Sequence, residues 1–449
     1  MLRLMEASVA AVPGIIRDKP AAEPTFLGHP RGLALLFLVE MWERFSYYGM
    51  RALLVLYLVN ALKWDTARAS NLYGSYTSLA YITPLLGGYL ADRFLGTRRS
   101  LVIGGILIAC GHFSLALTGT ATFYLGLALV IMGTGFFKPN VSTMVGQLYP
   151  EGDSRRDGGF TLFYMGINLG AFLAPLICGY LGERVGWHYG FGAAGVGMVL
   201  GLALYLWGRD KYLPGIGVGA PAARKLHVET SARSADDKKR VAALVIVVLF
   251  VVAFWSAFEQ SGSSMNLFAD KNTNRMVGSF LVPASWFQTV NAGFILLLAP
   301  LFAFMWRRLS SAGREPSTPM KMVFGLALLG IGFLFMVIGG RLADAGALVS
   351  PFWLIATYFL HTTGELCLSP VGLSYVTKVA PLRLASVLMA GWFLANGAGN
   401  KIAGSLAALS GSMSHASFFM IFFVTSMTAA ALLFFLVPRI NRLTAGVKL

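Results

Sequence analysis

The sequence predicts an all-α integral membrane protein with twelve transmembrane helices, arranged as two six-helix bundles around a central cavity. Two observations predict this fold class: long apolar runs recur along the chain, and one polar stretch divides them into equal halves. Charged residues make up only 12% of the chain, whereas soluble domains carry about 25%. A helix needs roughly 20 apolar residues to cross a bilayer. A water-soluble core therefore explains neither the number nor the length of these runs.

Polar turns between the apolar runs define the expected spans. The first 30 residues are polar and contain four prolines, without the apolar region of a cleaved signal peptide. We therefore expect the first span to act as the insertion signal. In chain order the predicted spans are 31–60, 70–91, 100–119, 122–144, 159–181, 188–208, 241–265, 284–306, 321–340, 351–377, 383–409 and 414–437.

The stretch 209–240 contains no apolar run long enough to cross a bilayer, and six spans precede it and six follow it. Two six-helix halves around a central site are a common plan of secondary transporters. The predicted division is an N-terminal tail, an N-terminal bundle, a basic linker, a C-terminal bundle and a C-terminal tail, at 1–30, 31–208, 209–240, 241–438 and 439–449.

The distribution of basic residues predicts the orientation. Most of the 36 Lys and Arg residues lie in the two tails, the linker and the loops on the same side. Basic residues concentrate on the cytoplasmic side of membrane proteins. We therefore expect a multi-pass protein of the cytoplasmic (inner) membrane with both termini in the cytoplasm. This placement accounts for most of the net charge of +16 without nucleic acid. The opposite side carries only Lys63, Arg68, Arg184, Lys271, Arg275 and Arg341.

The chain lacks the residue patterns of an enzyme or a cofactor protein. Its cysteines, Cys110, Cys178 and Cys367, lie in apolar segments without metal-ligand spacing. Its six histidines are scattered, and no nucleotide-binding loop is present. We therefore predict no catalytic residues, no cofactor, no metal site and no ATP-driven step.

Eight charged residues fall inside the predicted spans, not counting Arg31, Lys321 and Arg383 at the first position of a span. Each costs at least roughly 2.5–3.5 kcal/mol on insertion scales, so such residues are expected to face a cavity or one another. Their charges balance, which predicts a polar path through the protein interior and fits alternating gates better than an open pore. The acids are Glu40, Glu43, Glu259 and Glu365, and the bases are Arg44, Arg51, Lys138 and Lys401.

The rise of about 1.5 Å per helical residue predicts which of these charges meet. Arg51 lies about 30 Å along span one and Glu259 about 27 Å along span seven. These two residues share a depth in the outer half, so we expect them to pair. Lys138 is placed in the cytoplasmic half, near the depth of Glu40 and Glu43.

A buried carboxylate beside a base can switch between a paired, ionised state and a released, protonated state. This is the chemistry needed to couple a proton to gate opening. Static salt bridges between helices are the alternative for any one pair. That alternative is weaker for the whole set, because buried ion pairs are poor stabilisers after desolvation.

The stripe of charges lies in the segment EMWERFSYYGMR at 40–51. This segment resembles the first-helix signature of the proton-coupled oligopeptide transporter (POT/PTR) family of the major facilitator superfamily. The resemblance extends over roughly residues 30–440. It includes GYLADRFLG at 88–96, FKPN at 137–140, FTLFYMGINLGAF at 160–172, FEQ at 258–260, Asn291, GEL at 364–366 and GWF at 391–393.

The resemblance implies a symporter that imports di- and tripeptides with protons by alternating access. The implied proton-coupling residues are Glu40, Glu43, Arg44, Lys138, Arg51 and Glu259, with Arg51 and Glu259 as the gating ion pair. The implied substrate-binding residues are Arg44 and Lys138 for the peptide carboxylate, Glu365, Asn168 and Asn291 for its ammonium group, and Tyr47, Tyr48, Tyr81 and Trp392 as pocket walls.

The charges support this assignment independently, because opposite charges complement the two ends of a zwitterion. Tyr and Trp also suit variable side chains. The alternative is a relative that moves another small anion or zwitterion, such as nitrate, an amino-acid-like metabolite or a peptide-mimetic drug. The expected partners are the peptide, protons and the lipid bilayer, and the protein is expected to act as a monomer.

Three features depart from the family pattern or have no role in it. The linker is too short for the two extra helices of many bacterial members, and span two has no histidine. Lys401 has no implied role, and we expect it to extend toward the outer surface. His361 lies four residues before Glu365, where either a proton relay or a packed histidine fits.

Overall fold

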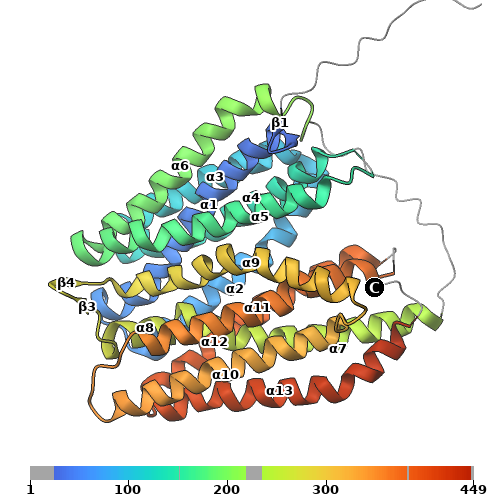
Figure 1. Cartoon of the computed structure of the whole chain (residues 1–449). Helices are drawn as coiled ribbons and strands as arrows, with labels where there is room; N and C mark the ends of the chain where they lie inside the picture. Colours follow the sequence, from blue (N-terminus) through green and yellow to red (C-terminus); the bar gives the residue numbers. More distant parts are fainter. Residues whose placement is uncertain (1–24, 151, 219–234, 382–383, 446–449) are drawn as a thin grey trace, which may run out of the picture.

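The computed structural model describes residues 25–150, 152–218, 235–381 and 384–445. Every predicted span corresponds to a long helical segment, and the prediction of an all-α, two-bundle protein is confirmed (Figure 1). The first half contains α1 (Arg31–Leu56), α2 (Thr66–Leu90), α3 (Thr97–Leu115), α4 (Thr120–Gln147), α5 (Arg156–Ala174) and α6 (Trp187–Tyr212). Single π-helical turns extend three of these helices at η1 (Tyr57–Ala61), η2 (Ala91–Leu95), η3 (Pro175–Gly179) and η4 (Leu181–Val185).

The second half contains α7 (Ala235–Phe258), α8 (Ser264–Asn272), α9 (Phe287–Ser311), α10 (Thr318–Asp344), α11 (Phe352–Val379), α12 (Ala385–Ala407) and α13 (His415–Leu443). Short 3₁₀ turns are η5 (Glu259–Gly262), η6 (Ala284–Trp286) and η8 (Ala408–Gly411). Two small antiparallel hairpins join β1 (Thr25–Phe26) to β2 (His29–Pro30) and β3 (Met276–Val277) to β4 (Phe280–Leu281).

Span seven differs from its prediction. It does not run as one helix to residue 265, because η5 interrupts it after α7 and α8 then continues to Asn272. The break lies beside Tyr73 of α2. A Cβ added to Gly262 would lie 1.8 Å from the Tyr73 hydroxyl, so any larger residue would displace that hydroxyl.

Seven of the described helical segments are long and apolar enough to cross a membrane by length and composition alone: Thr120–Gln147, Arg156–Val185, Trp187–Tyr212, Asp236–Asn272, Ala284–Ser311, Thr318–Asp344 and His415–Leu443. α1 does not qualify, because it carries four of the interior charges. Most of its residues are nevertheless buried, as expected for a helix enclosed by its neighbours. Composition therefore underestimates spans that line a polar interior.

The two bundles lie side by side in Figure 1, with α1 and α3–α6 above and α7 and α9–α13 below. The C-terminus and the start of α7 lie at one end of the helices, which we call the termini end. The β3–β4 hairpin lies at the other, the hairpin end. The bundles meet through α2 against α12 and α5 against α9. A Cβ on Gly74 of α2 would lie 2.7 Å from the Cα of Gly404 of α12, so these helices touch backbone to backbone.

The predicted linker is helical at both ends, since α6 continues to Tyr212 and α7 begins at Ala235. Residues 219–234 between them lie outside the described residues, as do 1–24 and 446–449 of the predicted tails. Arg98, at the start of α3, donates to the carbonyl of Ile216 at 2.7 Å and to that of Leu213. These bonds hold the segment that follows α6 against the first bundle.

Candidate functional site

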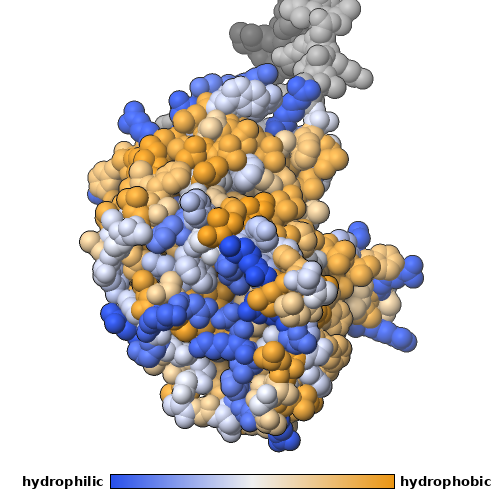
Figure 2. All heavy atoms as spheres, turned by 90° about the vertical axis from the view of Figure 1, so that its left-hand side faces the viewer, coloured by the Kyte–Doolittle hydropathy of each residue, from blue (hydrophilic) through white to orange (hydrophobic). Residues whose placement is uncertain are grey.

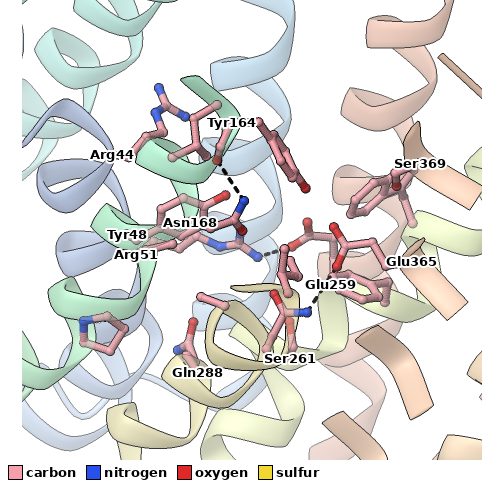
Figure 3. A pocket seen from close by; sticks show the side chains of 18 of the residues that line it. Arg44, Tyr48, Arg51, Tyr164, Asn168, Glu259, Ser261, Gln288, Glu365 and Ser369 are labelled. Carbon is pink, nitrogen blue, oxygen red and sulfur yellow. Dashed lines mark hydrogen bonds and ion pairs between the residues drawn. The ribbon is translucent and has the colours of Figure 1, made fainter. Parts of the chain in front are cut away.

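A cavity of about 250 Å³ lies between the two bundles (Figure 3). Six interior charges line it: Glu40, Arg44, Arg51, Lys138, Glu259 and Glu365. They come from α1 and α4 of the first bundle and from η5 and α11 of the second. The structure therefore brings together charges that lie more than 300 positions apart in the sequence.

The first-bundle wall carries two cations. Arg44 Nε lies 3.3 Å from Glu40 Oε1, and Arg44 Nη2 donates to Glu43 Oε1 at 2.6 Å. All three side chains are buried. Lys138 Nζ lies 4.3 Å from the centre of the Tyr81 ring. In this conformation Arg44 pairs with both acids, and Lys138 makes no ion pair within 4.0 Å among the described residues, so its predicted pairing with Glu40 and Glu43 stays a prediction.

Arg51 and Glu259 form an ion pair in the wall of the cavity (Figure 3). Arg51 also donates to the Tyr73 hydroxyl at 2.6 Å. Arg51 and Tyr73 belong to the first bundle and Glu259 to the second, so the pair crosses the interface. The contact expected from their common depth is present, with both side chains less than 10% exposed.

The second-bundle wall presents a carboxylate. Asn291 of α9 donates to Glu365 Oε2 at 3.1 Å and to Thr362 Oγ1 at 2.9 Å, which orients Glu365 of α11. Opposite, on α5, Asn168 donates to the Tyr164 carbonyl at 3.0 Å, and its side chain lines the cavity. The cavity thus has two cations on the first-bundle wall and, on the second-bundle wall, a carboxylate that accepts a hydrogen bond from Asn291.

Most of the expected substrate-binding residues line the cavity, namely Arg44, Tyr48, Tyr81, Lys138, Asn168, Asn291 and Glu365. Tyr47 and Trp392 do not. Tyr47 stacks on Tyr76 at 6.4 Å between ring centres, because it points toward α2 rather than into the cavity. Trp392 is 5% exposed and packs on Gly372, where an added Cβ would lie 2.2 Å from the ring. These two expected contacts are absent from the described cavity.

Sequence reasoning missed several cavity residues: Tyr164, Trp255, Ser261, Gln288, Tyr358 and Ser369. Helical spacing could have identified some of them. Tyr164 precedes Asn168 by one turn, and Trp255 precedes Glu259 by one turn, so each shares a face with a predicted residue. Gln288 lies three positions before Asn291 and is found by the same spacing.

Two residues left open by the sequence have defined positions. His361 is buried, with its ring 4.6 Å from that of Phe333, and it is not among the cavity residues. This geometry corresponds to the packed alternative. Lys401 does not simply extend outward: its Nζ donates to Ser75 Oγ of α2 at 2.8 Å, so it joins the two bundles. No His, Cys, Asp or Glu cluster suited to a metal ion occurs in the described part of the chain.

Known proteins are similar to this chain over most of its length. The sequence profile of the POT family matches residues 98–228 and 214–421. The chain is 38% identical to the peptide transporter YePEPT of Yersinia enterocolitica subsp. palearctica, over 85% of this chain and 88% of that protein. The chain belongs to the POT family. A POT family relative, the di-/tripeptide transporter of Lactococcus lactis subsp. cremoris, is 34% identical over 95% of this chain and 99% of its own length.

The fold of this POT family member is also that of solved relatives. A crystal structure of a peptide transporter POT in complex with sulfate superposes with a TM-score of 0.87 at 36% identity, covering 94% of this chain and 97% of that one. Family membership makes the protein a multi-pass membrane transporter and not an enzyme. The POT family signature in α1 therefore lies where the structure places the cavity charges.

Proposed function

We propose that this POT family member imports di- and tripeptides together with protons by alternating access. The observation that carries the proposal is the cavity with Arg44 and Lys138 on one wall and Glu365 on the other. A peptide zwitterion has a carboxylate for the first wall and an ammonium group for the second. The relatives from Yersinia and Lactococcus are a peptide transporter and a di-/tripeptide transporter, which supports the same substrate class.

The charge balance of the first-bundle wall supports coupling to protons. With all four side chains ionised, Glu40 and Glu43 contribute two negative charges, and Arg44 and Lys138 contribute two positive ones. An arriving peptide carboxylate competes with the acids for Arg44 and leaves the buried cluster with one excess negative charge. An unpaired charge at this depth is costly, so uptake of one proton by a displaced acid accompanies substrate binding.

Arg51 and Glu259 supply the gate in this proposal. Protonation of Glu259 removes the negative charge that pairs with Arg51. Without this ion pair the two bundles can separate toward the hairpin end. We expect the hairpin end to face the outside of the cell and both termini to face the cytoplasm, with the protein in the inner membrane, because basic residues concentrate on the cytoplasmic side. We take the protein to work as a monomer in the bilayer, since both walls of the cavity come from one chain.

A simple anion such as nitrate fits the cavity less well. Nitrate can pair with Arg44 or Lys138, but it has no positive group for Glu365. The structure holds the Glu365 carboxylate in place through Asn291, which donates both to Glu365 and to Thr362. The site therefore favours a substrate with both charges.

The test is uptake of labelled dialanine into proteoliposomes, with and without an inward proton gradient. Wild type is expected to accumulate peptide above equilibrium only with the gradient. Glu259→Gln is expected to lose accumulation and retain counterflow, because exchange needs no net proton movement. Asp344→Asn, a carboxylate change at the hairpin end within one bundle, is the matched control and keeps accumulation. Folded, inserted wild-type protein that takes up no peptide under any gradient would contradict the proposal.

A further inference from the structure

A second set of contacts joins the bundles at the hairpin end, beyond the cavity. Glu183 of η4 accepts hydrogen bonds from the backbone N–H groups of Ala284 at 2.8 Å and Ser285 at 2.9 Å. Arg275 Nη1 lies 3.7 Å from Glu183 Oε2, and Arg275 Nη2 lies 2.8 Å from Asp270 Oδ1. Asp270 Oδ2 in turn accepts from Asn60 Nδ2 at 2.8 Å. We call Glu183, Arg275, Asp270 and Asn60 the hairpin-end network.

The hairpin-end network crosses the bundle interface twice. Glu183 and Asn60 belong to the first bundle, whereas Asp270, Arg275 and the start of η6 belong to the second. The charged side chains are only 10–18% exposed, although they lie at the end of the helices. Figure 2 looks onto this end, where hydrophilic side chains gather across the middle of the face.

This network is separate from the Arg51–Glu259 pair. Asn60 follows Arg51 by nine positions on α1 and η1, which corresponds to about 13 Å along the helix toward the hairpin end. None of the four network residues lines the cavity. A neighbouring contact joins the same two bundles, since Trp286 Nε1 of η6 donates to the Leu176 carbonyl of η3 at 3.1 Å.

The contacts of Glu183 depend on the conformation of the transporter. Asp270 and Arg275 lie in one bundle and can stay paired when the bundles separate. Glu183 instead contacts only the other bundle, through the first N–H groups of η6 and through Arg275. A carboxylate at such a position is stabilised by charge-assisted hydrogen bonds and by the positive end of the helix that follows. Separation of the bundles removes all of these contacts together.

We propose that Glu183 is a positioning residue of the transport cycle: it forms a second closure at the hairpin end and thereby sets the ratio of closed to open states there. The inference rests on the alternating access of the proposed function, but not on the identity of the substrate. Loss of its charge removes stabilisation from the closed state only, because the open state lacks these contacts.

The test measures the distance between the bundles directly. Leu117 and Leu348 lie at the hairpin end in different bundles, are 59% and 64% exposed, and do not belong to the network. Spin labels on Leu117→Cys and Leu348→Cys, with the three native cysteines replaced, report the separation by pulsed electron paramagnetic resonance. Glu183→Gln is expected to raise the ratio of long to short distances by about tenfold, the effect of losing charge-assisted hydrogen bonds from one state.

Asp344→Asn is the matched control. Asp344 also accepts from two backbone N–H groups at the hairpin end, those of His415 at 2.9 Å and Ala416 at 3.0 Å, but all three residues lie in the second bundle. This variant is expected to lower thermal stability and leave the distances unchanged. Glu183→Gln with a lower melting temperature and unchanged distances would overturn the proposal, since the residue would then act only as a structural contact.

The distances also separate this proposal from the proposed function. They are recorded without peptide and without a gradient. If wild type transports no dialanine but Glu183→Gln still raises the long-distance population, the closure stands and only the substrate assignment fails. If Glu259→Gln and Glu183→Gln both leave one short distance, the bundles do not separate at this end, and the positioning role of Glu183 is overturned.

Discussion

Glu365 provides the sharpest test of how the substrate is oriented. The residue is 8% exposed, its carboxylate accepts from Asn291 at 3.1 Å, and it lines the same cavity as Arg44 and Lys138. Glu365→Gln keeps the size of the side chain and an oxygen for Asn291 but removes the charge. A hydrogen bond to a charged group contributes about 1.5–3 kcal/mol, so the affinity for dialanine is expected to fall roughly 10- to 150-fold.

The assay is isothermal titration calorimetry on purified protein with two ligands, dialanine and N-acetyl-dialanine. The acetylated ligand has no ammonium group, so Glu365→Gln is expected to change its affinity by less than about threefold. This comparison is a double-mutant cycle with one change in the protein and one in the ligand. Equal losses for both ligands would refute the reasoning, because Glu365 would then act on the shape of the cavity rather than on the peptide ammonium.

Two further predictions concern the bundle interface and the loop before α10. Gly74→Leu is expected to prevent closure at the hairpin end and abolish gradient-driven uptake, because an added Cβ meets the Gly404 backbone at 2.7 Å; the control Gly391→Leu, where nothing lies within 4 Å of an added Cβ, keeps short distances and uptake. The hydrogen bond from Lys321 holds the pKa of Glu315 below its usual value. That stabilisation is present above the ordinary pKa of 4.5 and is lost as the pH falls through the lower folded value. The melting temperature of Glu315→Gln is therefore expected to lie below that of wild type at pH 7 and to converge with it once the pH is below the lowered pKa of Glu315; a difference that persists in acid would contradict this cause.

Depth in the membrane was predictable from the sequence, because the helical rise is nearly constant. Arg51 and Glu259 lie in different bundles and more than 200 positions apart, yet their common depth identified the contact that the structure contains. Glu365, another charge expected inside a span, also lines the cavity. Two-bundle architecture likewise follows from apolar runs and one polar stretch, since both report the bilayer rather than the details of packing.

Direction around a helix was less predictable, because it depends on neighbours that the sequence does not identify. Tyr47 and Tyr48 are adjacent, so they point about 100° apart, and only Tyr48 lines the cavity. Tyr47 stacks on Tyr76 instead. Trp392 also points away from the cavity, because its ring packs against Gly372 of the neighbouring helix. Both residues match the aromatic pattern of the family, and the pattern alone does not distinguish a wall residue from one that packs behind it.

The choice of partners for the acids of α1 shows a second limit. Depth places Lys138 near Glu40 and Glu43, but Arg44 lies on the same helix as both acids and reaches them without any movement between helices. A local pair forms at lower entropic cost than one that must align two helices. Lys138 instead lies over the Tyr81 ring at the cavity, where the proposed function assigns it to the peptide carboxylate as a second cation.

α1 carries both a cation of the first-bundle cavity wall, Arg44, and a member of the ion pair between the bundles, Arg51. Arg44 and Arg51 lie seven positions apart on it, about 10 Å along the axis and on nearly the same face. Further along, the Ala52 carbonyl accepts from Asn266 of the second bundle at 2.9 Å, so a shift of α1 changes both bundle contacts and cavity charges. In the proposed function, competition of a peptide carboxylate for Arg44 and protonation of Glu259, the partner of Arg51, would therefore both act on α1. In the proposed cycle, one charge for the substrate, Arg44, and one charge of the gate, Arg51, therefore lie on the same twelve-residue segment of α1.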